Sequence, residues 1–124
     1  MHVLGQMVEA VKPGGHVLDL QVIRPNPVVE VDGRTICEIN GEPLFVSADA
    51  ATAAVDALAH DGVLVEEAVD DHDVREHYTD GNDLVSAYAT KRRRLPPDEF
   101  PALRPLAKPC AVLERCRLRR LRVR

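Results

Sequence analysis

The stretch MVEAVKPGGHVLDLQ, residues 7–21, determines how the start of the chain folds. Apolar residues recur on one helical face just before and within it: Val3, Leu4, Met7, Val8 and Val11. This spacing predicts a helix over 2–11. Lys12-Pro13-Gly14-Gly15 should end that helix, because proline breaks the hydrogen-bond ladder and glycine allows a tight reversal. Residues 16–23 then alternate as a strand does, which places the polar pair Asp19 and Gln21 together on one face.

The composition predicts one soluble globular domain over residues 1–124. The chain is 45% apolar and 29% charged, which argues against disorder. Aromatic residues make up only 3%, too few for a platform that stacks single-stranded nucleic acid. No run of 18 apolar residues predicts a membrane span, and the N-terminus lacks the pattern of a signal peptide. Three cysteines, an odd number, favour thiols and a cytoplasmic location over a disulfide framework.

Charge is distributed unevenly along the chain. Residues 1–90 hold four basic and 17 acidic residues, net −13, whereas residues 91–124 hold 12 basic and three acidic residues, net +9. A basic tail can bind nucleic acid. The alternative is that it packs beside the acidic remainder of the same domain, and we favour this because apolar residues such as Val112 and Leu121 are interspersed with the arginines.

Residues 24–46 are expected to form a hairpin insertion. Arg24-Pro25-Asn26-Pro27 is predicted to be a loop, and two β-prone runs follow on either side of Asp32-Gly33. An Asp-Gly pair between such runs predicts a two-residue turn, because both positions need positive φ. Asn40-Gly41 predicts a second turn.

The remaining patterns predict a helix, a strand, a helix and a strand. Ser47 should cap a helix over 48–60, with Gly62 just past its end and a strand over 63–69. Residues 70–109 should hold an acidic turn at 70–76, a helix over 83–94 capped by Asp80 or Asn82, and a proline-rich connector with one helical turn around Ala102. A last strand is expected over 110–123, with a β-bulge near Arg119-Arg120. This alternation favours an α/β architecture.

Local motifs identify no reaction. The best metal candidate is the run Asp70–His77, which holds carboxylates and two histidines five residues apart, a spacing that does not place them on one helical face. We therefore favour a solvated acidic turn and predict no metal site. Cys110 and Cys116 are too far apart for a zinc pair and are expected to be buried thiols. Gly14-Gly15 precedes a strand rather than a helix, so it is not a phosphate loop.

The segment from Met7 to Gln21 resembles a stretch of class I S-adenosylmethionine-dependent methyltransferases, in which a Lys-Pro-Gly-Gly turn leads into the fifth strand. The downstream order is similar: an insertion, a helix, a sixth strand, a second insertion and a last strand. The terminal ERCRLRRLRV, residues 114–123, resembles the family's closing strand. The resemblance implies a partial Rossmann-like sheet with an inserted β-hairpin, in which strand 110–122 lies antiparallel between strands 16–23 and 63–69.

The resemblance covers only the C-terminal half of that fold. The family binds its cofactor through a Gly-x-Gly-x-Gly turn after the first strand, and none of the seven glycines here forms such a triplet. S-adenosylmethionine is thus implied by the resemblance alone, no cofactor-binding residue can be assigned, and the isolated chain is expected to bind none. The family's acceptor side would correspond by position to Asp19, Gln21 and Arg24, the candidate substrate-facing residues.

Two functional interpretations stay open. The chain is either the substrate-side half of a methyltransferase, completed by a missing N-terminal half or a partner chain, or a non-catalytic α/β binding or interaction module. Whether it acts as an enzyme and which methyl acceptor it takes are open at this stage. A half-domain should leave apolar strand surface uncovered, which favours self-association into a homo-oligomer.

Overall fold

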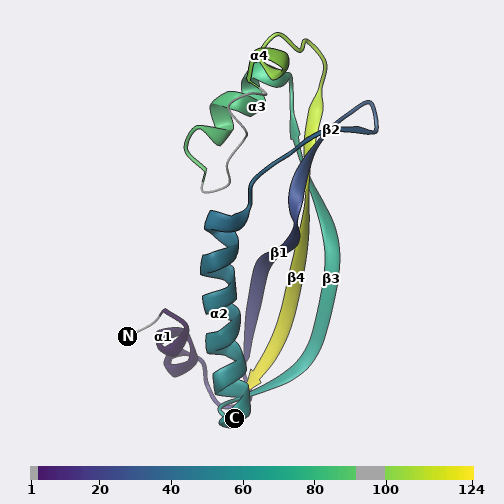
Figure 1. The fold of residues 1–124 in the computed structure, drawn as a ribbon. Coiled ribbons are helices and arrows are strands. Elements are labelled where there is room, and N and C mark those ends of the chain that lie inside the picture. The colour runs from purple at the N-terminus through teal and green to yellow at the C-terminus, as the bar shows by residue number, and fades with distance from the viewer. Residues whose placement is uncertain (1–2, 92–99) are drawn as a thin grey trace.

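The computed structural model describes residues 3–91 and 100–124. Within these residues the elements are, in order, α1 (Val3–Ala10), β1 (His16–Val31), β2 (Arg34–Glu38), α2 (Glu42–His60), β3 (Leu64–Tyr78), α3 (Gly81–Tyr88), α4 (Phe100–Leu103) and β4 (Cys110–Val123). Figure 1 shows a long, curved sheet with α2 lying along it and α3 and α4 gathered at one end. The α/β class predicted from the alternation is confirmed.

The sheet formed by the described residues has four strands in the order β2-β1-β4-β3. Every neighbouring pair is antiparallel. The C-terminal strand β4 therefore lies between β1 and β3, which run in the same direction. This is the strand order predicted for 16–23, 110–122 and 63–69.

The predicted hairpin turn is confirmed. Asp32 and Gly33 both have positive φ, 51° and 76°, and Val31 lies opposite Arg34 across the turn. A register shift between Val29 and Glu30 sets Val29 opposite Cys37, one residue beyond the simple pairing. The turn chemistry was thus sufficient to locate the hairpin, whereas the bulge was not predictable from it.

The loop predicted at 24–27 is wrong, because β1 continues through it. β4 pairs with β1 on both sides of this segment, at Ile23↔Arg115 and at Val28↔Leu113, with a shift of register between them. The prolines at 25 and 27 are accommodated as an irregularity in the strand rather than as its end.

The acidic turn predicted at 70–76 is also wrong, because these residues continue β3 to Tyr78. Each pairs with a residue of β4, and Asp71 and Asp73 lie opposite Arg117 and Arg115. The repulsion that makes an acidic run a poor strand is relieved by this basic neighbour.

Two helix boundaries differ from prediction. α2 begins at Glu42 rather than at 48, because Gly41 is its N-cap and a proline fits the first helical turn; Ser47 lies inside the helix. α3 ends at Tyr88, short of the predicted 94, and residues 92–94 and Pro96-Pro97 lie outside the described part. Of the two predicted caps, Asp80 and Asn82, the structure has Asp80, whose carboxylate accepts a hydrogen bond from the Asp83 N–H at 2.8 Å.

Three smaller predictions concern single positions. Gly62 has a φ of 79° just past α2, as its place predicts. α4 is the single helical turn expected around Ala102. The bulge expected in β4 near Arg119-Arg120 is in its neighbour instead, because Glu67 of β3 is the extra residue opposite that point.

Two apolar clusters hold the described residues together. One joins Val17, Leu121 and Val123 to Val55 and Leu64, beneath α2. The other joins residues of β1, β3 and β4, and Ile39 just after β2, to α3 and α4: Val29, Ile39, Tyr78, Leu84, Val85, Tyr88, Leu103, Cys110 and Val112. Odd-numbered residues of β4 enter the first cluster and even-numbered residues the second, so the buried side of this strand changes along its length.

Candidate functional site

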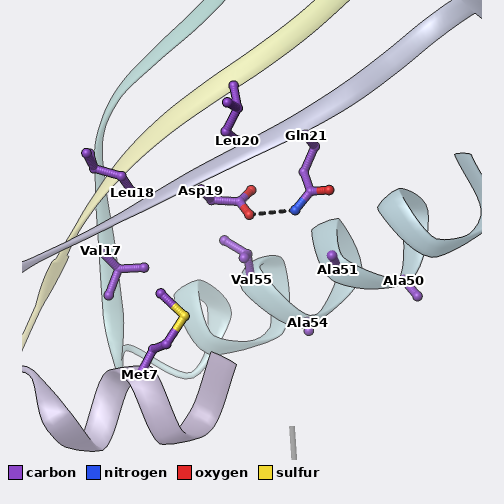
Figure 2. Close-up of a pocket in the computed structure, with 10 residues that line it drawn as sticks. All are labelled: Met7, Val17, Leu18, Asp19, Leu20, Gln21, Ala50, Ala51, Ala54 and Val55. Atoms are coloured by element: carbon purple, nitrogen blue, oxygen red, sulfur yellow. Dashed lines mark hydrogen bonds between the residues drawn. The ribbon is translucent and has the colours of Figure 1, made fainter. Parts of the chain in front are cut away.

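A cleft of about 550 Å³ lies between β1, α1 and α2. It is lined by Met7, Val17, Leu18, Asp19, Leu20, Gln21, Ala50, Ala51, Ala54 and Val55. Figure 2 shows the side chains of Asp19 and Gln21 directed toward α2 and those of Leu18 and Leu20 on the other side of the strand. The cleft stays open because α2 presents alanines to β1 at this level, and their short side chains cannot fill the space between helix and strand.

Asp19 and Gln21 form the polar part of the cleft. The two residues are two positions apart in β1, so their side chains share one face of the strand. Gln21 Nε2 donates a hydrogen bond of 2.8 Å to Asp19 Oδ1. The second carboxylate oxygen, Asp19 Oδ2, is buried and has no hydrogen-bond partner among the described residues. A buried acceptor without a donor is costly, on the order of 1–3 kcal/mol. Asp19 Oδ2 is therefore a buried acceptor in this cleft that requires a hydrogen-bond donor from outside the described chain.

Arg24, the third predicted site residue, does not line the cleft. Its guanidinium donates to Glu42 and to Asp49, both of α2, with N···O distances of 3.1–3.2 Å. Its carbon Cζ also lies 5.0 Å from the centre of the Phe45 ring. The hydrogen bonds that Arg24 donates to Asp49 and Glu42 raise the pKa of Arg24. Arg24 thus fastens the middle of β1 to the first half of α2.

Arg119, which was predicted only to lie near a β-bulge, is directly across from Asp19 on β4. Its side chain is 9% exposed and bridges two elements, with Nη2 2.9 Å from Asp56 on α2 and 2.5 Å from Glu66 on β3. Burial alone would lower the pKa of Arg119, but the hydrogen bonds that it donates to Glu66 and Asp56 outweigh this effect and raise the pKa. The strand alternation could have placed Arg119 beside Asp19, had the register between these two strands been known.

The chemistry available in the cleft is limited. Asp19 is its one ionisable lining residue in the described part of the chain. An apolar chamber with a single carboxylate can hold an apolar group that carries a hydrogen-bond donor. It offers no nucleophile next to a base, which covalent catalysis would need.

The acidic run Asp70–His77, which was the metal candidate, forms ion pairs across the sheet. Asp71 accepts two hydrogen bonds from Arg117, at 2.8 and 2.9 Å, and Asp73 accepts one from Arg115 at 3.1 Å. Alternation along β3 turns His72 to the opposite face from these carboxylates. In the described ranges, no group of three or more His, Cys, Asp or Glu side chains could hold a metal ion.

These ion pairs also explain the uneven charge of the sequence. Arginines of β4 pair with acidic residues of β3 and α2 over most of the length of the strand. The interpretation that the basic segment packs beside the acidic part of the same domain is therefore confirmed for β4, whereas residues 92–94 lie outside the described part of the chain.

A second polar cluster lies at the other end of the sheet. Lys91 Nζ is 2.8 Å from Glu76 Oε1 and 4.8 Å from the centre of the Tyr88 ring. Tyr78 donates its hydroxyl to Glu76, and burial together with this hydrogen bond raises the pKa of Tyr78. The lysine already satisfies the carboxylate, so this cluster fixes the end of α3 onto β3.

The three cysteines are thiols, and Cys110 and Cys116 are buried as expected. Burial raises the pKa of the Cys110 thiol, which makes it a weak nucleophile.

Comparison with known proteins finds no family model, no curated protein and no solved structure that matches this chain. Among the described residues, no helix has both the length and the apolar character needed to span a membrane.

Proposed function

We propose that this chain is the C-terminal, substrate-side half of a class I S-adenosylmethionine-dependent methyltransferase fold. The observation that carries the proposal is the strand order β1-β4-β3, with β4 antiparallel between two strands of like direction. The resemblance assigns these strands to the fifth, last and sixth strands of the family, and the last strand is inserted there in the same way.

The unpartnered part of β1 supports the same proposal. β2 pairs only with the segment from Val28 to Val31, so among the described residues no strand pairs with the outer edge of His16–Ile23. On the face away from α2, Leu18 is 61% exposed and Leu20 is 59% exposed. A fold that placed further strands and helices before the fifth strand would cover both the edge and this face.

The cleft residues take the substrate-side role in this proposal. Asp19 and Gln21 would face the acceptor, and Arg24 would hold β1 and α2 at the separation that keeps the cleft open. None of the ten residues that line the cleft is a glycine, whereas the family binds S-adenosylmethionine through a glycine turn after its first strand, which the resemblance places outside this chain. We therefore assign the cofactor to the half that precedes this chain or to a partner chain, and we derive no chemical step through it.

One observation favours the second interpretation, a non-catalytic interaction module. Asp19 is the one ionisable group in the cleft of the described chain, which suits binding better than proton transfer. The two interpretations differ in whether a cofactor half exists.

The DNA upstream of the Met1 codon tests the proposal in its single-chain form. We expect an in-frame continuation that encodes a Gly-x-Gly-x-Gly turn. Where the frame is closed upstream, affinity purification of the tagged chain from its own cells should recover a partner that carries this turn. Absence of both would leave the interaction module as the correct interpretation.

A further inference from the structure

The two outer edges of the sheet have opposite character along most of their length. β3 forms one edge, and its 15 residues include six carboxylates, an arginine and two histidines. Charged side chains on an edge strand prevent it from pairing with another chain. The other edge is the segment His16–Ile23 of β1, in which five of eight residues are apolar and one is a carboxylate. By this criterion the β3 edge is protected and the β1 edge is built to accept a strand.

The segment is also complementary to itself. In an antiparallel pair of identical strands, the twofold axis passes between the two copies of one residue, which lie opposite each other. Residues that lie opposite each other point to the same face of the sheet. With the axis at Leu20, Asp19 lies opposite Gln21 of the second copy, and Leu18 lies opposite Val22. The polar residues then meet each other on the α2 face, and the exposed leucines meet apolar residues on the opposite face.

The two neighbouring registers, with the axis at Asp19 or at Gln21, bring less favourable side chains together. An axis at Asp19 places two carboxylates opposite each other, which is destabilising. An axis at Gln21 places Asp19 opposite Ile23. Of these three registers, only the axis at Leu20 brings a hydrogen-bond donor opposite Asp19, namely the Gln21 amide of the second copy. Asp19 Oδ2 is buried and has no donor in the described chain.

We propose that the 124-residue chain forms a twofold dimer in which residues 16–23 of two copies pair antiparallel about Leu20 and continue the sheet from one copy to the other. The dimer does not depend on the methyltransferase proposal, because it follows from the edge and its side chains. It would occupy the edge that a cofactor half would otherwise cover, so the two partners exclude each other.

Disulfide cross-linking tests both the dimer and its register. Leu18 and Leu20 are equally exposed, at 61% and 59%, and share one face of β1. In the proposed register, the Cα atoms of residue 20 in the two copies lie about 5 Å apart, within disulfide range. The Cα atoms of residue 18 are separated by four residues along the strands, about 13 Å, and cannot be bridged.

Mild oxidation of Leu20→Cys should therefore give a covalent dimer of twice the 13.7 kDa chain mass, and oxidation of Leu18→Cys should not. Val46→Cys, at a residue of α2 that is 65% exposed, controls for random collisions. Leu20→Lys should convert the dimer to monomer in sedimentation experiments while leaving the thermal melt of the monomer unchanged. A wild-type chain that stays monomeric at high micromolar concentration, or equal cross-linking of the Leu18→Cys and Leu20→Cys variants, would overturn the proposal.

Discussion

Replacing Gly81 with alanine should destabilise the protein more than any exposed substitution in α3. Gly81 is buried at the first position of the helix, and a Cβ there would lie 1.6 Å from the carbonyl oxygen of Leu103. To restore van der Waals contact, the backbone of α4 must retreat by about 2 Å. That movement would also break the hydrogen bond of 3.0 Å from the Gly81 N–H to the Leu106 carbonyl.

The expected cost combines two effects. Overpacking costs about 1–3 kcal/mol, and a lost backbone hydrogen bond costs about 1 kcal/mol. Gly81→Ala should therefore lower the free energy of unfolding by about 2–4 kcal/mol, which corresponds to roughly 10 °C in Tm for a chain of this size. Urea and thermal unfolding followed by circular dichroism measure this, with the exposed Ser86→Ala as the matched control in the same helix. A Gly81→Ala protein as stable as that control would refute the packing of α4 against α3.

Three further predictions address the hairpin, the core and the ion pair between Asp71 and Arg117. Gly33→Val should cost about 1–2 kcal/mol in urea unfolding, because valine resists the φ of 76°, whereas Gly33→Asn should cost much less. Leu121→Ala, at a fully buried position, should cost about 2–5 kcal/mol, whereas Leu18→Ala should cost under about 1 kcal/mol when measured on the monomer; similar losses would mean that Leu18 is covered. The hydrogen bonds from Arg117 hold the pKa of Asp71 in the folded protein below its usual value of 3.8. The ion pair therefore stabilises the fold above pH 3.8, and this stabilisation is lost as the pH falls through the pKa of Asp71 in the folded protein. The urea midpoint should therefore fall more steeply below pH 4 in the wild type than in Asp71→Asn.

Local signals in the sequence were enough wherever a few neighbouring residues fix the backbone. Asp32-Gly33 predicted its turn because the two positive φ angles depend on those residues alone. Asp80 was one of two predicted caps of α3, and the helix begins at Gly81 rather than at 83. The helix–turn–strand at residues 3–23 was predictable from its periodicity and its Pro-Gly-Gly turn. The position of β4 between β1 and β3 came from the family resemblance, since no local pattern determines strand order.

The errors share a physical cause, which is a neighbour distant in sequence. The run from Asp70 to Glu76 was expected to be a turn because its carboxylates repel one another, and the arginines that neutralise them lie more than 35 residues later. Arg24 was grouped with Asp19 and Gln21 by position, but two carboxylates of α2 draw it away from the cleft. Arg119 was not recognised because its partners, Asp56 and Glu66, are brought to it only by the fold.

The central claim is that this chain supplies one half of a cofactor-dependent fold, and titration calorimetry with S-adenosylhomocysteine tests it most directly. The 124-residue chain and the same chain joined to its cofactor half, whether encoded upstream or purified as a partner, are titrated under the same conditions. The account predicts saturable one-to-one binding by the joined form and no saturable heat for the 124-residue chain. Saturable one-to-one binding in the micromolar range by the 124-residue chain alone would contradict it.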